Sequence, residues 1–166
     1  MTVSNADLLA LARELPIPVP WDRDVFISNL AQSRGRPIRL IPTNTAALTD
    51  SPCGLWVTLE DEDLILHETG TSEYHIDQIV CHEVGHMALG HSRCEKFGDD
   101  KARQVQLCVS LLPDVDPASV HAILGRMSYP NDEERDAEMF ANMLMVAAAE
   151  AAADDSMMRS VFFWPR

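Results

Sequence analysis

The sequence is short of basic residues and of long apolar runs. Lys and Arg number 13 against 26 Asp and Glu, which gives the 166 residues a formal net charge of −13. The longest nearly apolar stretch, residues 143–149, is far below the roughly 20 residues that a membrane-spanning helix requires. We therefore expect no membrane span. We also expect no direct binding of nucleic acid, because an acidic surface repels phosphate.

The acidic excess is confined to one part of the chain. Residues 1–50 hold five basic and five acidic residues, whereas residues 51–166 hold eight basic and 21 acidic residues. A basic protein partner would be attracted to this second part. An acidic surface also serves solubility alone, because net charge bears on solubility and association rather than on identity.

Cysteine is also sparse. The four cysteines, Cys53, Cys81, Cys94 and Cys108, form no CxxC pair and are too few for a disulfide-stapled domain. Residues 1–10 contain no basic residue, so they do not resemble a secretory signal. We therefore expect reduced thiols and a cytoplasmic location.

Apolar periodicity and helix breakers predict helices, then short strands, in the first part of the chain. Helices are expected over residues 5–15 and 22–35, the first ending before a Pro-rich segment. Strands are expected over residues 38–41, 55–59 and 64–67, with the last two joined as a hairpin by an acidic turn. This pattern predicts a small, mainly antiparallel, three-stranded sheet.

Further helices are expected after the sheet. Ser72 is a suitable N-cap for a helix that ends at Leu89, and Gly90 is a suitable stop. The remaining helices are expected over residues 101–112, 117–126 and 131–153. Helices, a small sheet and more helices make an α+β fold.

The whole chain, residues 1–166, is predicted to form a single domain. Residues 1–20 would be an N-terminal helix followed by a Pro-rich linker, and residues 154–166 a C-terminal tail.

Residues 82–86 read HEVGH, the HExxH motif, and lie within the helix expected after Ser72. Because four residues make slightly more than one helical turn, His82 and His86 project from one face and lie close enough to bind one ion. Two imidazoles and a carboxylate suit zinc, which keeps one position open for water. Glu83 is the candidate general base. The alternative is an exposed helix with incidental histidines.

A third protein ligand has to come from another segment. The metzincin spacing would need a histidine where the chain has Ser92, and His91 is expected to lie past the helix end. The acidic segment 131–142 is the better candidate, because Glu134 and Glu138 lie one turn apart on the last helix. One would bind the metal while the other accepts the N–H of a ligating histidine. Without the HExxH motif, such acids would simply complement the helix dipole.

The paired motifs HEVGHMALGH (residues 82–91) and EERDAEMFANMLM (residues 133–145) resemble those of the ImmA/IrrE family of zinc metallopeptidases. The later motif of that family reads approximately Glu-x-x-Ala-(Asn/Asp)-x-Phe-Ala, which matches residues 134–141. The resemblance covers residues 20–150. It implies a compact zincin-like fold, in which a small twisted sheet packs on the HExxH helix and a helical bundle carries the third ligand.

The resemblance also implies a role for each matched residue. His82, His86 and Glu134 would bind one Zn²⁺ per chain, and Glu83 would be the general base that activates zinc-bound water. Glu138 would orient a ligating histidine, at a position where the family more often has Asn or Asp.

Two further features of the site are expected. A transition-state oxyanion needs a donor besides zinc; Tyr129 is the candidate, with His121 and Tyr74 as alternatives. In zincins the substrate lies extended along a sheet edge, which either strand 55–59 or strand 64–67 would supply.

Members of the family cleave helix-turn-helix transcriptional repressors. The resemblance therefore implies a zinc-dependent endopeptidase that hydrolyses a peptide bond in one such regulatory protein, and a basic DNA-binding partner would suit the acidic surface. The alternative is a non-catalytic zinc module, or a toxin–antitoxin-like component, that sequesters a regulator. The intact Glu83 favours the enzyme. A broad digestive protease is a weaker interpretation, because no secretory signal or disulfide framework is apparent.

Overall fold

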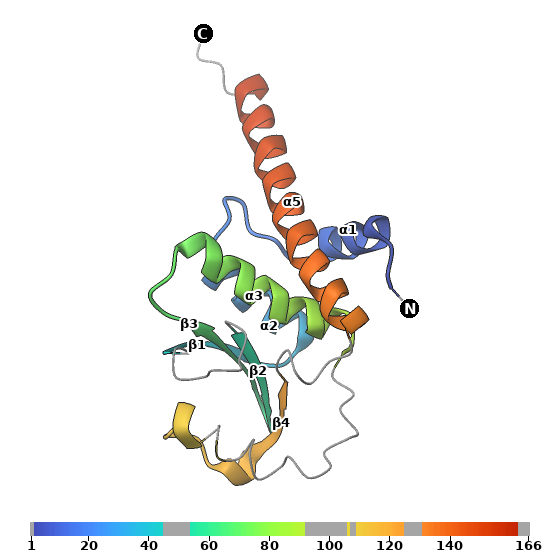
Figure 1. Ribbon diagram of the computed structural model, residues 1–166. Helices are drawn as coiled ribbons and strands as arrows, with labels where there is room; N and C mark the ends of the chain where they lie inside the picture. Colours follow the sequence, from blue (N-terminus) through green and yellow to red (C-terminus); the bar gives the residue numbers. More distant parts are fainter. Residues whose placement is uncertain (1, 45–53, 92–105, 107–108, 125–130, 163–166) are drawn as a thin grey trace.

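The computed structural model describes residues 2–44, 54–91, 106, 109–124 and 131–162 (Figure 1). In chain order the elements are α1 (Asn5–Glu14), α2 (Arg23–Arg34), β1 (Ile38–Thr43), β2 (Gly54–Leu59), β3 (Asp63–Glu68), α3 (Glu73–Ala88), the 3₁₀ turn η2 (Pro117–Ser119), β4 (Val120–Leu124) and α5 (Asn131–Phe162). This arrangement confirms the α+β class.

The sheet has four strands in the order β1-β3-β2-β4 and is mixed. The predicted hairpin is present, because β2 pairs with β3 antiparallel, and β4 also pairs with β2 antiparallel. β1 pairs with β3 in parallel. The sequence predicted a sheet of three strands, so that prediction missed one strand.

The missing strand is β4, which lies where a helix was expected over residues 117–126. That prediction was wrong. Asp116 accepts a hydrogen bond from the Ala118 N–H at 2.9 Å, as an N-cap would, but only the single turn η2 follows. The backbone of residues 120–124 instead pairs with β2, and tertiary pairing of this kind overrides weak helix signals.

Apolar side chains of the sheet alternate between two cores. Ile65 belongs to a large core formed with α1, α2, α3 and α5, whereas Leu64 and Leu66 belong to a second core on the opposite face. Figure 1 shows α2 and α3 on one face of the sheet, with α5 crossing α3. The HExxH helix α3 therefore lies between the sheet and α5.

The ends of α3 follow the predicted signals. The Ser72 side chain accepts a hydrogen bond from the His75 N–H at 3.2 Å, as an N-cap does. Gly90 adopts a φ of +70°, a conformation that favours glycine and stops the helix.

α5 is longer than expected and continues to Phe162, so residues 154–162 are helical rather than a tail. The remainder of the expected tail lies outside the described residues, as does most of the helix expected over residues 101–112. Among the described residues, no helix is both long and apolar enough to span a membrane.

Candidate metal centre

α3 places both motif histidines on one face. The Nε2 atoms of His82 and His86 lie 3.1 Å apart, and the two rings meet edge to face with centroids 4.8 Å apart. This is the outcome of the i, i+4 spacing within one helix. His86 is 1% exposed, so its ring is enclosed by protein.

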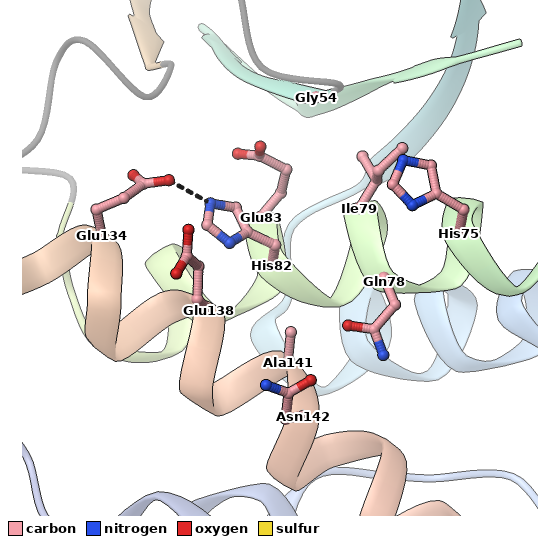
Figure 2. Close-up of a pocket in the computed structure, with 10 residues that line it drawn as sticks. All are labelled: Gly54, His75, Gln78, Ile79, His82, Glu83, Glu134, Glu138, Ala141 and Asn142. Atoms are coloured by element: carbon pink, nitrogen blue, oxygen red, sulfur yellow. Dashed lines mark ion pairs between the residues drawn. The ribbon is translucent and has the colours of Figure 1, made fainter. Parts of the chain in front are cut away.

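Glu134 reaches the same point from α5. Its Oε1 lies 3.2 Å from His82 Nε2, and its Oε2 lies 3.5 Å from His86 Nε2. Figure 2 shows the carboxylate directed at the His82 ring. The ligand atoms of these three residues all lie within 4.8 Å of one another, so the cluster could hold a metal ion.

The spacing of these atoms fits a small divalent cation. Zinc–ligand bonds of roughly 2.0–2.1 Å place neighbouring ligand atoms of a tetrahedron about 3.3 Å apart. The separations of 3.1, 3.2 and 3.5 Å bracket that value. Two imidazoles with one carboxylate suit zinc as a donor set, and other first-row divalent metals also accept it.

Close packing of α5 on α3 holds Glu134 in place. A Cβ added to Gly85 would lie 3.1 Å from the Ala137 carbonyl oxygen and 3.1 Å from Phe140 Cδ1. Ala137 and Phe140 are both 0% exposed. The small residue within HEVGH therefore lets the backbone of α5 come close enough for its carboxylate to reach the histidines.

Burial and hydrogen bonding set the charges of the cluster. Burial acts to raise the pKa of Glu134, but hydrogen bonds from His82 and His86 outweigh it and lower that pKa to about 2. Burial lowers the pKa of His86. Burial also acts to lower the pKa of His82, but the hydrogen bond to Glu134 outweighs burial and raises that pKa. At neutral pH the cluster thus presents a carboxylate and a neutral His86 ring, the forms that bind metal.

Glu83 is buried beside this cluster. It is 2% exposed, and its Oε2 has no hydrogen-bond partner among the described residues. Burial raises the pKa of Glu83 to about 8. The start of β2 passes over it, because a Cβ on Gly54 would lie only 2.9 Å from Glu83 Oε1 (Figure 2). A buried carboxyl group without a partner is expensive for a fold to keep, which points to a functional role.

The cluster opens into a cleft of about 390 Å³. Its lining includes two predicted site residues besides the ligands, Glu83 and Glu138, and Figure 2 shows Glu138 beside His82. The expected role of Glu138 in orienting a histidine stays a prediction. The other residues that line the cleft are Gly54, His75, Gln78, Ile79, Ala141 and Asn142.

Helical spacing from predicted site residues pointed to several of these lining residues. Gln78 lies four residues before His82, and Asn142 lies four residues after Glu138. Helical periodicity therefore places each of them one turn from a predicted site residue. Gly54 carried no such signal, because its position over the site depends on how the sheet packs on α3.

Of the expected oxyanion donors, the structure describes Tyr74 and His121. Tyr129 lies outside the described residues. Tyr74 is 64% exposed near the start of α3, and His121 is exposed on β4. Neither of these two lines the cleft.

The expected substrate edge needs correction. β2 and β3 are both interior strands, because β4 covers β2 from Trp56 to Leu59 and β1 covers the length of β3. Only the first two residues of β2, Gly54 and Leu55, extend past the described pairing with β4. Of these two residues, Gly54 lines the cleft.

His91, expected to lie past the helix end, contacts the site. Its Nδ1 lies 2.9 Å from Nδ1 of His86. His82 and His86 thus approach Glu134 through their Nε2 atoms. The other ring nitrogen of His86, Nδ1, contacts His91.

Comparison of the chain with protein-family models, curated proteins and solved structures gives no match.

Proposed function

We propose that this protein is a zinc-dependent metalloendopeptidase with a zincin-like active site. The observation that carries the proposal is the buried carboxyl of Glu83, whose Oε2 lacks a partner among the described residues, next to the His82, His86 and Glu134 cluster. A structural metal site would need no such group. A hydrolase needs a base beside the water that it activates.

The three convergent side chains would hold the ion, and the chemistry of the donor set fits zinc. When bound, zinc supplies Lewis acidity, which lowers the pKa of a water molecule and polarises a peptide carbonyl. One Zn²⁺ per chain is what this single cluster would accommodate.

Glu83 takes the proton from water in the cleft and later passes it to the leaving amine. In the protein alone, burial holds its pKa near 8. A nearby cation favours the carboxylate form, because opposite charge stabilises the ionised group. The carboxyl lies against Gly54, and both residues line the cleft (Figure 2).

The substrate fits best as an extended segment of a basic protein. The cleft runs beside the start of β2, where a peptide strand would meet Gly54 and Leu55. The chain carries a net charge of −13, which attracts a basic partner such as a DNA-binding domain. Together with the resemblance to the ImmA/IrrE family, this supports cleavage of a helix-turn-helix repressor in the cytoplasm, and hence a role in transcription regulation.

Co-expression with the helix-turn-helix protein encoded nearest to the gene tests this proposal. We expect one discrete cut, found by gel and mass spectrometry, with zinc-loaded wild type. Glu83→Gln should keep its zinc and lose at least the roughly 10²–10⁴-fold that general-base catalysis contributes. Glu150→Gln, a matched change farther along α5, should cut normally. A stable complex that neither enzyme form cleaves would contradict the peptidase and favour the sequestering module.

A further inference from the structure

His91 sits against the face of the site that is remote from the cleft. Its ring centroid is 5.1 Å from that of His86, with the planes inclined at 62°. The Nδ1–Nδ1 distance of 2.9 Å is that of a hydrogen bond, so one of the two nitrogens carries the proton.

The end of α3 builds this contact. The Gly90 N–H donates to the Met87 carbonyl at 3.3 Å, and the His91 N–H donates to the His86 carbonyl at 3.0 Å. These two bonds, with Gly90 at φ +70°, form a Schellman motif. In that motif the residue after the glycine packs on the residue five positions earlier, commonly as an apolar pair. Here the pair is two histidines.

The direction of the hydrogen bond follows from the proposed metal site. His86 Nε2 faces His82 and Glu134, so it supplies the lone pair to an ion. A neutral imidazole has one N–H, which must then be on Nδ1. That N–H points at His91 Nδ1, whose lone pair accepts it.

The acidic start of α5 also acts on His91. The carboxylates of Glu133, Asp136 and Asp132 interact electrostatically with His91. His91 therefore has both His86 and the acidic start of α5 as neighbours.

We propose that His91 is a positioning residue of the metal centre, which accepts a hydrogen bond from Nδ1–H of His86 and so fixes the tautomer and orientation of that ligand. This inference rests on the proposed function. Outer partners of metal-bound histidines are usually carboxylates or carbonyls, and their loss typically weakens metal binding by about 10–100-fold. In this chain the partner would be His91, which directly follows the glycine that ends α3.

Three substitutions at one position separate hydrogen bonding from packing. His91→Leu gives the Schellman motif its common apolar contact but accepts no hydrogen bond. His91→Phe keeps a ring and also accepts none. His91→Gln is similar in size to leucine and offers an amide oxygen to the Nδ1–H. His82→Ala removes a proposed ligand and so shows how far zinc affinity falls when the metal site is lost.

Zinc affinity is measured by chelator competition, with the visible spectrum of the Co²⁺ form as a second readout. The apoprotein melting temperature reports packing. We expect His91→Leu and His91→Phe to weaken zinc binding by about 10–100-fold and to alter the Co²⁺ spectrum, with little change in apoprotein melting. His91→Gln should regain most of the affinity. If one apolar variant fails to fold, the other carries the test.

The outcomes distinguish the two proposals. Tight wild-type binding that is lost in His82→Ala but unchanged in both apolar variants overturns the role of His91 and leaves the metal centre standing. Affinity that falls equally in all three His91 variants also overturns it, since packing would then explain the loss. A wild type that binds no zinc overturns the metal centre and the role of His91 together.

Discussion

The two halves of α5 differ sharply in environment. In the first half, Ala137, Phe140 and Leu144 are fully buried against the rest of the protein. In the second half, Met157 and Val161 are 66% and 67% exposed. Figure 1 shows the second half extending away from the sheet and from α3. One continuous helix therefore has buried residues as far as Ala148 and none over residues 149–161.

The proposed metal ligand of α5 lies in the packed half, where its position is fixed. Glu134 lies in the packed half, on a helix that approaches α3 closely at Gly85. A ligand on such a rigid element is held at a defined distance from its partners. Residues 149–161 include no buried residue and none of the proposed ligands, so we expect changes there to affect neither stability nor metal binding strongly.

The largest contrast is expected from truncating one side chain in each half. Phe140→Ala would leave a cavity in the core and should lower the free energy of unfolding by about 3–5 kcal/mol. Met157→Ala should change it by less than about 0.5 kcal/mol, because the side chain is exposed. Urea denaturation of both variants measures this, and similar losses in the two would contradict the comparison.

Within α5, only the first half should contribute to stabilisation by zinc, because Glu134 lies there. At a free zinc concentration 100 times the dissociation constant, the gain in unfolding free energy should be about 2.7 kcal/mol. Glu134→Gln should abolish most of this gain, because a neutral amide is a poor replacement for the ligand. Glu150→Gln, in the second half of the same helix, should keep it. Denaturation with zinc and with a chelator gives the gain for each variant, and equal behaviour of the two would rule out Glu134 as the ligand.

Gly85→Ala should destabilise the protein by about 1–3 kcal/mol through overpacking against α5. Helix propensity alone predicts the opposite sign, a gain of about 1 kcal/mol. Overpacking should prevail because a Cβ would lie 3.1 Å from both the Ala137 carbonyl oxygen and Phe140 Cδ1. Thermal melting of the apoprotein decides the sign, and a stabilised variant would show that the close approach is unimportant.

The smallest effect is expected where α1 meets the start of the exposed half. Arg13 donates to both carboxylate oxygens of Glu150, at 3.0 and 2.9 Å from Nη2, but the side chains are 55% and 45% exposed. An exposed pair of this kind contributes about 0.2–1 kcal/mol and weakens with salt. A double-mutant cycle of Arg13→Ala and Glu150→Ala at low and high salt measures it. A salt-independent coupling above that range would contradict the comparison.

Local signals predicted most of the helices and the hairpin. Ser72 and Gly90 bounded α3 because capping depends on neighbouring residues. β4 was missed because its pairing partner, β2, lies about 60 residues earlier in the chain. The end of α5 was also misplaced, although the residues after 153 offer no glycine or proline before Pro165 to stop the helix.

For the site, spacing within one helix was enough to bring His82 and His86 together. Glu134 was found through its motif, while its approach to the histidines depends on packing at Gly85. His91 was not predicted as a site residue because it falls beyond the helix. The signal was nevertheless local, since a Gly-His pair four and five residues after His86 is the spacing of a Schellman motif. Gly54 could not be found from the sequence, because only the packed sheet places it over Glu83.

The most direct test of the metal centre is the X-ray absorption spectrum of the zinc-loaded protein, with the metal content measured on the same sample. We expect one zinc per chain, bound by two imidazole nitrogens and by oxygen ligands at roughly 2.0–2.2 Å. Sulfur ligands at about 2.3 Å, or less than stoichiometric zinc after loading, would contradict the proposed centre.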